Sequence, residues 1–306
     1  MKKILVATDK PFAKIAVDQI RQIIEESGFQ LVLLEKYKSQ DDLIKAAGEA
    51  NAIIIRSDIV DAPVIKAGRD LQIVVRAGAG YDNVDLKEAT NHGVVVMNTP
   101  GQNANAVAEL AMGMMVYMAR NLFNGSSGTE LKDKTLGLHA YGNVSKNMAR
   151  IARGFGMRIS AFDPFIDPII IKNDNVTCLA DLKELYATCQ YVSLHIPSNA
   201  QTKESVNYEL LSLMPKGAVL VNTARKEVIN EASLLRIMKE RADFRYVSDV
   251  EPGCAAELVK DCPGRYYCTP KKMGAQTEEA NINAGVAAAR QIVSFFKNGD
   301  ITFKVN

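Results

Sequence analysis

The sequence predicts an α/β protein with two parallel-sheet domains, and two observations lead to this prediction. Short apolar runs rich in β-branched residues alternate along the chain with segments whose apolar residues recur at every third or fourth position. That alternation is typical of parallel strands connected by helices that cover both faces of a sheet. The chain also has 306 residues, a length at which one hydrophobic core usually gives way to about two domains.

The N-terminal third of the chain contains the first series of predicted strands. Between the first two strands, residues 12–28 have apolar residues at helical spacing and end at Gly28, which is a helix stop signal. The predicted strands of this series cover residues 2–8, 30–35, 51–57, 72–78 and 93–98.

The connection between the domains is predicted in a long apolar helix, roughly residues 104–122, because the segment NGSSG follows it. A final amphipathic helix at about residues 278–297 needs a surface to cover, and we expect it to return to the first domain. The first domain then comprises residues 1–98 plus 276–306, and the second comprises residues 99–275. Two crossings predict a cleft between the domains, where ligands usually bind. Strands of the second series are predicted at residues 135–140, 158–163, 191–196, 218–223, 244–250 and 265–270.

Composition and charge exclude several classes of protein. The 37 Lys and Arg residues nearly balance the 35 Asp and Glu residues, so we expect no nucleic-acid partner, although a small anionic ligand is compatible. No apolar run approaches the ~18 residues of a membrane span, and the N-terminus reads as a strand rather than a signal sequence. The five cysteines lack paired spacing and the three histidines are scattered, which predicts free thiols, a cytoplasmic location and no metal site.

A dinucleotide-binding unit is predicted where the strand at 135–140 runs through Tyr141-Gly142-Asn143-Val144 into a helix. In Rossmann-like units, glycines let the backbone approach a pyrophosphate at a helix N-terminus, and an acid about 20 residues on binds the ribose. Asp163, at the end of the next strand, has that spacing from Gly142. Two of the three expected glycines are replaced, by Ala140 and Ser145. The pattern indicates two Rossmann-like or flavodoxin-like sheets, one of which binds a dinucleotide.

Asp163 also distinguishes between cofactors. A carboxylate at this position repels the 2′-phosphate of NADP, so we expect NAD as the cofactor. The alternative interpretation is that Asp163 only begins a turn before Pro164.

A series of motifs extends over nearly the whole chain: RSDIVDAPVI, VVRAGAGYDNVDL, GVVVMNTPGQNA, AELAMGMM, TLGLHAYGNV, AFDP, LHIP, GAVLVNTARKEVIN, SDVEP and TPKKMGAQTEEA. In this order they resemble the D-2-hydroxyacid dehydrogenase family, and R-A-G-x-G-x-D-N-V-D with N-T-P and N-T-A-R is closest to members that oxidise D-3-phosphoglycerate. The resemblance implies an NAD-dependent hydride transfer that forms 3-phosphohydroxypyruvate in serine biosynthesis. It also implies the split domain arrangement and a homodimer.

The resemblance assigns roles to individual residues. It implies that Arg225, in N-T-A-R, orients the substrate and polarises its carbonyl, which a planar guanidinium does and a lysine would not reproduce. The alternative role of Arg56 is a structural salt bridge. The alternative for the glycine loop at residues 76–80 is a plain turn, and for His195 it is packing within its strand. The implied substrate-binding residues are Arg56, Ser57, Arg76, Gly78, Ala79, Gly80 and Asn103. The cofactor-binding residues, with those of the dinucleotide turn, are Tyr141, Gly142, Asn143, Val144, Asp163, His195, Pro197, Thr223, Ala224 and Asp249.

The family's proton-transfer histidine is missing from this chain. It normally lies in a P-H-[IL]-G-[AG]-x-T segment, whereas residues 269–277 read TPKKMGAQT. Alignment from the C-terminal side places Lys272 at that position, and alignment from Pro270 places Lys271 there; we prefer Lys272 as the acid/base. A lysine transfers protons near neutral pH if burial and a neighbouring cation such as Arg225 lower its pKa. The alternative is a surface lysine in a basic pair.

Further departures from the family bear on partners and regulation. The glutamate that accompanies the family's histidine is displaced, so neither Glu251 nor Glu257 is assigned a catalytic role. The segment after the apolar helix is shorter than the arm that many relatives use for dimer contacts, and the methionines of that helix could serve either a dimer face or the core. The chain ends soon after the last helix, which predicts no C-terminal regulatory domain.

Two alternative functions stay open at this point. The same fold could act on another D-2-hydroxy acid or its 2-oxo acid, such as glycerate and hydroxypyruvate. A non-catalytic NAD-sensing protein would explain the missing histidine and the replaced glycines. Retention of Arg225 and of the loop at Gly78 counts against the sensor, because a pure sensor of NAD needs no oxo-acid site.

Overall fold

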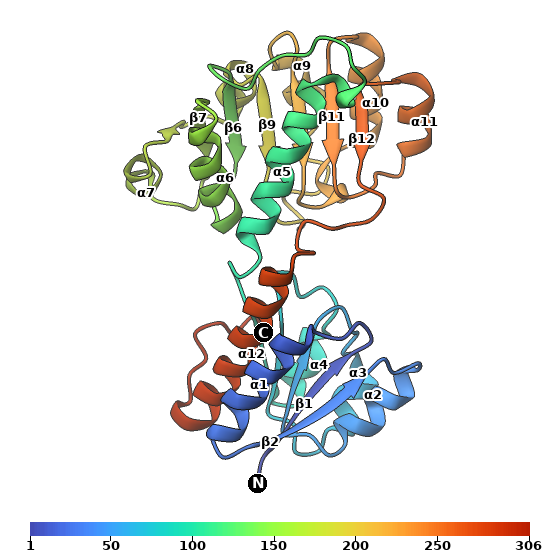
Figure 1. Ribbon diagram of the computed structural model, residues 1–306, viewed down its shortest axis with the longest axis vertical. Helices are drawn as coiled ribbons and strands as arrows, with labels where there is room; N and C mark the ends of the chain where they lie inside the picture. Colours follow the sequence, from blue (N-terminus) through green and yellow to red (C-terminus); the bar gives the residue numbers. More distant parts are fainter. The chain divides into compact units, whose positions relative to one another are not determined.

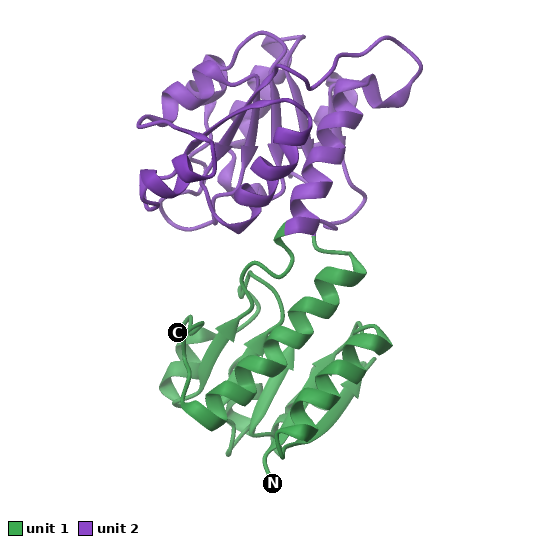
Figure 2. Cartoon of the chain, turned by 60° about the vertical axis from the view of Figure 1, so that its left-hand side comes forward, with its two compact units in different colours: residues 1–104, 275–306 green, residues 105–274 purple.

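The structure is a computed structural model that describes residues 1–306 and contains two compact units (Figure 2). Unit 1 comprises residues 1–104 and 275–306, and unit 2 comprises residues 105–274. The first boundary predicted from the sequence lies earlier, after Asn98. Residues just beyond Asn98 still belong to unit 1, since the Thr99 N–H donates to the Gly78 carbonyl at 3.0 Å.

Unit 1 is built on a five-stranded parallel sheet in the order β2-β1-β3-β4-β5 (Figure 1). Successive residues of β1 point to opposite faces: Ile4 and Val6 pack against α1 and α12, while Leu5 and Ala7 pack against α2 and α3. Helices therefore cover both faces, which explains why these strands are apolar throughout. The elements are β1 (Lys3–Thr8), α1 (Lys14–Glu26), β2 (Gln30–Glu35), α2 (Gln40–Ala47), β3 (Ala52–Ile55), α3 (Ala62–Ala67), β4 (Ile73–Arg76), α4 (Leu86–Asn91), β5 (Val95–Asn98) and α12 (Glu278–Asn298).

Local signals set the ends of the helices in unit 1. Gly28 has a φ of +82°, and α1 ends just before it, so the predicted stop is confirmed. Ser39 and Asp42 form a reciprocal capping box at the start of α2. The Thr277 hydroxyl accepts a hydrogen bond from the Ala280 N–H at 3.1 Å and caps α12.

Unit 2 is built on a seven-stranded parallel sheet in the order β12-β11-β10-β9-β6-β7-β8 (Figure 1). The chain order reverses between β6 and β9, and α/β proteins bind ligands at the carboxyl ends of the strands around such a switch point. One face packs against α5 and α6, and the other against α8, α9 and α10. The elements are α5 (Ala104–Ala119), β6 (Thr135–His139), α6 (Asn143–Gly154), β7 (Arg158–Phe162), α7 (Pro168–Asn173), β8 (Thr177–Cys178), α8 (Leu182–Thr188), β9 (Tyr191–Leu194), α9 (Tyr208–Leu213), β10 (Val219–Asn222), α10 (Glu231–Glu240), β11 (Arg245–Ser248), α11 (Ala255–Asp261) and β12 (Tyr266–Cys268).

Two elements of unit 2 differ from the sequence prediction. Strand β8 has only two residues and lies at the edge of the sheet, so no periodic pattern marks it. Helix α5 ends at Ala119 rather than near residue 122, because Asn121, Leu122 and Phe123 have φ angles of 50°, 56° and 55°. The methionines of α5 are buried in the core of unit 2, which is one of the two roles considered for them. A membrane-crossing helix of sufficient length and apolar character is absent from the fold.

Candidate active site

The turn between β6 and α6 leaves space for an anion at the start of a helix. Gly142 precedes α6, and no side chain caps the first turn of that helix. A Cβ atom built on Gly142 would have nothing within 4 Å, so a bound group can approach the backbone there. The N–H groups of the first turn are therefore available for a phosphate.

The two replaced glycines are accommodated in different ways. Ser145 is fully buried, and its hydroxyl donates to the Ala140 carbonyl at 2.7 Å, which ties the first turn of α6 to the end of β6. Ala140 has a φ of +80°, a conformation in which an alanine is strained and a glycine is not.

Replacing Ala140 with glycine is therefore expected to raise the free energy of unfolding by about 1 kcal/mol, because it removes the strain of the left-handed backbone. Urea unfolding of the full chain measures the change. The matched control is Ala187→Gly, at an exposed position inside α8, which is expected to lower stability by about 1 kcal/mol. A loss of stability in both variants would contradict the strain at Ala140.

The Asp163 carboxylate connects the ends of β6 and β7. Oδ2 accepts a hydrogen bond from the Tyr141 N–H at 2.7 Å, and Oδ1 accepts one from the Phe165 N–H at 2.9 Å. The turn considered as the alternative role is therefore present, and each carboxylate oxygen still has capacity for a further donor. The Tyr141 side chain is buried and donates to Asp174 Oδ2 at 2.9 Å, so only the backbone of Tyr141 lies at the turn.

Two of the histidines lie together at the carboxyl ends of β6 and β9. The His195 N–H donates to the His139 carbonyl at 3.0 Å, and His139 Nδ1 lies 3.1 Å from the Tyr186 hydroxyl. Burial lowers the pKa of His139 to about 4. Burial, with a smaller contribution from His139, lowers the pKa of His195 to about 3. Both are neutral near pH 7, which fits a packed strand residue rather than a proton carrier.

Acid is expected to destabilise unit 2 through these histidines. Between pH 6.5 and about 4 the unfolded chain binds more protons than the folded chain, so the free energy of unfolding falls as the pH decreases through this window. Each histidine is expected to contribute about 2 kcal/mol of loss at pH 5. The measurement is the shift in urea midpoint between pH 7.5 and pH 5, which His139→Gln should reduce. A shift in His139→Gln that equals the wild-type shift would contradict the assignment.

A cavity of about 350 Å³ lies at the carboxyl ends of β10, β11 and β12. It is lined by Arg225, which follows β10, by Asp249, which follows β11, and by Lys271 and Lys272, which follow β12. Neighbouring parallel strands thus bring together residues that are far apart in the sequence. The cavity contains both candidates for the acid/base together with the arginine of N-T-A-R.

Arg225 is held by a braced turn after β10. Asn222 is fully buried; its Oδ1 accepts from the Ala224 N–H, and its Nδ2 donates to the Arg225 carbonyl, both at 3.0 Å. The Arg225 guanidinium donates to the Ala224 carbonyl at 2.9 Å. Asn222 is not among the residues predicted from the sequence, although an amide at the end of an apolar strand is a signal that it has a structural partner.

Asp249 is a buried carboxylate beside the two cationic positions. It is 1% exposed, and its Oδ2 accepts from the Gly274 N–H at 2.8 Å. Burial raises its pKa, and this is opposed by the Gly274 N–H and by the charges of Lys272 and Arg225. Lys272, but not Lys271, thus acts on the pKa of Asp249. Both lysines are exposed in the structure, so unit 2 itself does not supply the burial considered for a catalytic lysine.

In unit 1, the Arg56 guanidinium is extensively bonded. It donates to the Lys10 carbonyl at 3.2 Å, to the Pro11 carbonyl at 3.4 Å and to Asn281 Oδ1, and it lies 5.2 Å from the centre of the Phe12 ring. Burial lowers its pKa, opposed by Asp58 and Asp9. Arg56 is therefore a packing residue that joins α12 to the ends of β1 and β3, in addition to any role in binding. The neighbouring Ser57 is exposed. The backbone around it is held by the Asp58 carboxylate, which accepts from the Asp9 N–H at 2.8 Å and from the Arg56 N–H at 3.2 Å.

The predicted glycine loop of unit 1 is shaped by Arg76. A Cβ atom on Gly78, whose φ is +145°, would lie 1.5 Å from Arg76 Nη1. The φ of +145° favours glycine at this position, and the mobile end of the Arg76 side chain occupies the space beside it. Arg76 Nε donates to the Arg56 carbonyl at 3.0 Å, and the Ala79 carbonyl accepts from Asn98 Nδ2 at 2.6 Å. Gly80 and Asn103 are partly exposed.

Comparison with known proteins identifies the family. Residues 116–262, all within unit 2, match the family model described as D-isomer specific 2-hydroxyacid dehydrogenase, NAD binding domain. The hydroxypyruvate reductase of Thermotoga maritima is 33% identical over 280 residues, which are 86% of this chain and 90% of that protein. The chain belongs to the D-isomer specific 2-hydroxyacid dehydrogenase family. The predicted fold class and the NAD-dependent dehydrogenase are thereby confirmed.

Other relatives of this 2-hydroxyacid dehydrogenase are named for phosphoglycerate. The D-3-phosphoglycerate dehydrogenase of Rattus norvegicus is 34% identical over 303 residues, which are 94% of this chain and 56% of that protein. The chain thus spans a little over half the length of the curated phosphoglycerate dehydrogenases that it matches. The NAD⁺-bound 3-phosphoglycerate dehydrogenase of Entamoeba histolytica has a TM-score of 0.91 and 48% identity, and the match covers 100% of this chain and 98% of that one.

The residues of unit 2 in this 2-hydroxyacid dehydrogenase fit NAD. Asp249 Oδ1 and Thr223 Oγ1 are buried without a hydrogen-bond partner in the structure, and such atoms need a polar group to satisfy them. Both residues follow strands of the sheet, and they lie at the carboxyl ends of the strands, as the open turn at Gly142 does. We expect the pyrophosphate at Gly142 and Asn143, and the nicotinamide carboxamide at Asp249. His195 and Pro197, beyond β9, belong to the same edge.

Proposed function

We propose that this protein oxidises D-3-phosphoglycerate to 3-phosphohydroxypyruvate with NAD and thereby supplies serine biosynthesis. The observation that carries the proposal is the cavity lined by Arg225, Asp249 and Lys272 at the carboxyl ends of the strands in the NAD-binding sheet. Support for the phosphorylated substrate comes from the 48% identity to a 3-phosphoglycerate dehydrogenase and from Arg56 and Arg76, which lie close together in unit 1.

In the proposed mechanism, Arg225 binds the substrate carboxylate and the oxygen on C2. A guanidinium presents its donors in one plane, so it can hold both oxygens and stabilise the charge that develops on the C2 oxygen. Asn222 keeps the backbone of Arg225 in place through its two hydrogen bonds. The arginine would therefore hold C2 of the substrate in one orientation, as hydride transfer to a bound nicotinamide requires.

Lys272 is proposed to move the hydroxyl proton. Bound NAD supplies the acceptor for the hydride that leaves C2. Neutral Lys272 takes the proton from the C2 hydroxyl as the C=O bond forms, and in the reverse direction the ammonium returns it. The products are the 2-oxo acid, NADH and one proton, so atoms and charge balance.

A second substrate has support of its own. The hydroxypyruvate reductase of Thermotoga maritima matches over 90% of its length, and the Arg56 guanidinium already has carbonyl and amide partners in this chain. Both observations favour D-glycerate and hydroxypyruvate, in which there is no phosphate to bind.

Initial rates of NADH formation from D-3-phosphoglycerate, D-glycerate and D-lactate test the proposal. If cationic side chains bind the phosphate, kcat/KM for D-3-phosphoglycerate should exceed that for D-glycerate by about tenfold or more. Equal or faster oxidation of D-glycerate would assign the enzyme to the second substrate. The same assay with NADP tests Asp163, because equal efficiency with NADP would contradict repulsion of a 2′-phosphate.

We also propose that the protein is a cytoplasmic homodimer. All five cysteines are unpaired, as expected for a reducing compartment. Phe123, which is 65% exposed next to Tyr117 at the end of α5, provides apolar surface for a second copy. Sedimentation of the full chain with Phe123→Asp should give a lower mass than the wild-type protein; a wild-type monomer would contradict the dimer.

A further inference from the structure

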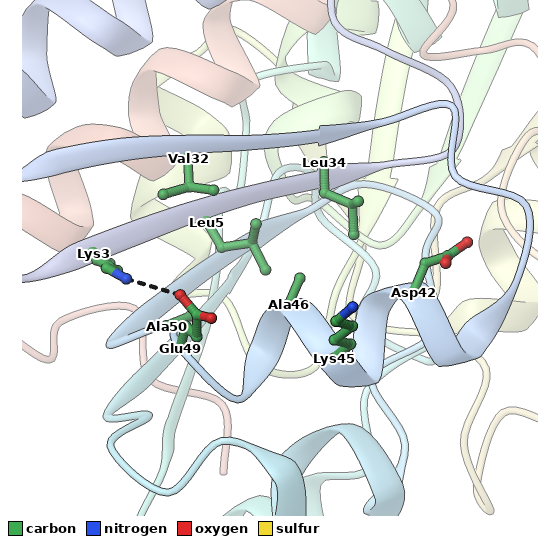
Figure 3. A pocket seen from close by; sticks show the side chains of 9 residues that line it. All are labelled: Lys3, Leu5, Val32, Leu34, Asp42, Lys45, Ala46, Glu49 and Ala50. Atoms are coloured by element: carbon green, nitrogen blue, oxygen red, sulfur yellow. Dashed lines mark hydrogen bonds and ion pairs between the residues drawn. The ribbon is translucent and has the colours of Figure 1, made fainter.

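A second cavity, of about 330 Å³, lies in unit 1 between the edge strand β2 and helix α2 (Figure 3). None of the candidate active-site residues lines it. Its apolar lining comes from Leu5 on β1, Val32 and Leu34 on β2, Ala46 on α2, and Ala50 just after that helix. Its volume is near the lower end of the range for small-molecule sites.

The cavity follows from the shortness of α2 and the small residues that it presents. The helix has eight residues and buries Leu43 and Ala47 in the core. Towards β2 it presents Ala46, whose side chain points into the space below Leu5 and Leu34 in Figure 3. Val32 and Leu34 are consequently only partly buried on this face of the sheet. An apolar ligand could complete their burial.

Four charged residues surround the apolar lining, and three of them have partners. Lys3 Nζ lies 2.9 Å from Glu49 Oε2, and Asp42 Oδ2 accepts from the Lys38 and Ser39 N–H groups at 3.3 and 3.2 Å. Lys45, which lies on α2 one turn after Asp42, makes no direct hydrogen bond or ion pair, and its charge acts at longer range on Asp42 and Glu49, whose pKa values it lowers. Lys45 is therefore the charged group of the rim that has no direct hydrogen-bond partner.

We propose that this cavity binds a small apolar monocarboxylate, with its hydrocarbon chain against Leu5, Val32 and Leu34 and its carboxylate at Lys45. An amine is disfavoured, because both acids of the rim already have donors. An uncharged alcohol would gain the same apolar contacts without the ion pair. The site is separate from the proposed reaction, so its test does not depend on turnover.

Calorimetric titration of the full chain with butanoate, hexanoate and octanoate measures the apolar part of the site. Each buried methylene is worth about 0.8 kcal/mol, so affinity should rise about fourfold per methylene until the cavity is filled. Octanol should bind more weakly than octanoate, and octylamine more weakly still.

Two variants separate the charge from the cavity. Lys45→Gln is expected to weaken octanoate binding about threefold to fivefold and to leave octanol binding unchanged, because the lost ion pair is exposed. Ala46→Phe places a ring in the space and is expected to abolish binding of both. Lys14→Gln, at an exposed position on α1, is the matched control and should bind like the wild type. Oxidation of the hydroxy acid should be the same in all three variants, which also shows that they fold.

Several results would overturn the proposal. They are octylamine binding as tightly as octanoate, an affinity that does not depend on chain length, and octanoate binding to Lys45→Gln that matches the wild type. Absence of any binding at about 10 mM octanoate would also overturn it, because the methylene contributions predict a tighter constant. If Ala46→Phe instead changes the oligomeric mass, the surface is an interface between copies of the chain rather than a ligand site.

Discussion

Replacing Arg225 with glutamine is expected to lower kcat/KM for the hydroxy acid by about 10³-fold, while the affinity for NADH stays within about twofold. A single donor to a developing oxyanion is worth about 10²–10³ in rate, and Arg225 is proposed to bind the carboxylate as well. The braced turn at Asn222 holds the backbone, so the variant should keep its fold and lose only the guanidinium. Steady-state kinetics and fluorescence titration with NADH measure the two quantities.

Arg225→Lys separates charge from shape. A lysine keeps the charge but lacks the planar pair of donors, so it should recover no more than about tenfold of the lost activity. Arg236→Gln is the matched control, because that guanidinium is exposed on α10 and pairs with Glu240 at 2.8 Å. Wild-type kcat/KM in Arg225→Lys would show that a point charge is sufficient, and full activity in Arg225→Gln would remove Arg225 from the mechanism.

Much of the fold is predictable from the sequence because its signals are local. The strands of both sheets appear as β-branched runs, since burial on two faces requires apolar residues at every position. Gly28 ends α1 as expected because its φ of +82° suits glycine. The strand Thr177–Cys178 was not predictable, because two residues at a sheet edge carry no periodicity.

The sequence allowed us to predict which residues form the candidate site, but not which contacts these residues make. Motifs located Arg225, Asp249 and the lysine pair, and parallel strands bring such residues to one edge of the sheet. The partners of Arg56 were not predictable, because Asn281 is 225 residues away in the sequence. The surroundings of Gly78 were not predictable either, because only the folded structure shows the Arg76 guanidinium beside its backbone. The positions of residues in the sequence show which of them lie at the carboxyl ends of the strands, whereas long-range packing determines which bonds these residues form.

Replacing Lys272 with methionine is expected to lower kcat by about 10²–10⁴-fold, the usual contribution of a positioned acid/base. The affinity for NADH should change less than kcat, because the open turn at Gly142 is unaffected, although the charge of Lys272 acts on the pKa of Asp249. Lys271→Met is a matched control on the same loop, and it should keep kcat within about threefold. Comparable losses in both variants would assign the pair to general charge rather than to proton transfer by Lys272.

The pH dependence distinguishes a proton carrier from a structural cation at Lys272. Oxidation needs the neutral amine, so its rate should rise with pH; reduction of the 2-oxo acid needs the ammonium, so its rate should fall with pH. Lys272→Met should lose both of these opposite dependences. In Lys272→Ala, added ethylamine should restore part of the oxidation rate, since it supplies the missing base without restoring any structural contact of the side chain. Unchanged pH profiles in Lys272→Met would exclude proton transfer by this lysine. Full activity of Lys272→Ala without any effect of ethylamine would also exclude it. The opposite slopes are the decisive observation, because a residue that only attracts the substrate's negative charge would weaken both directions in the same way as the pH rises.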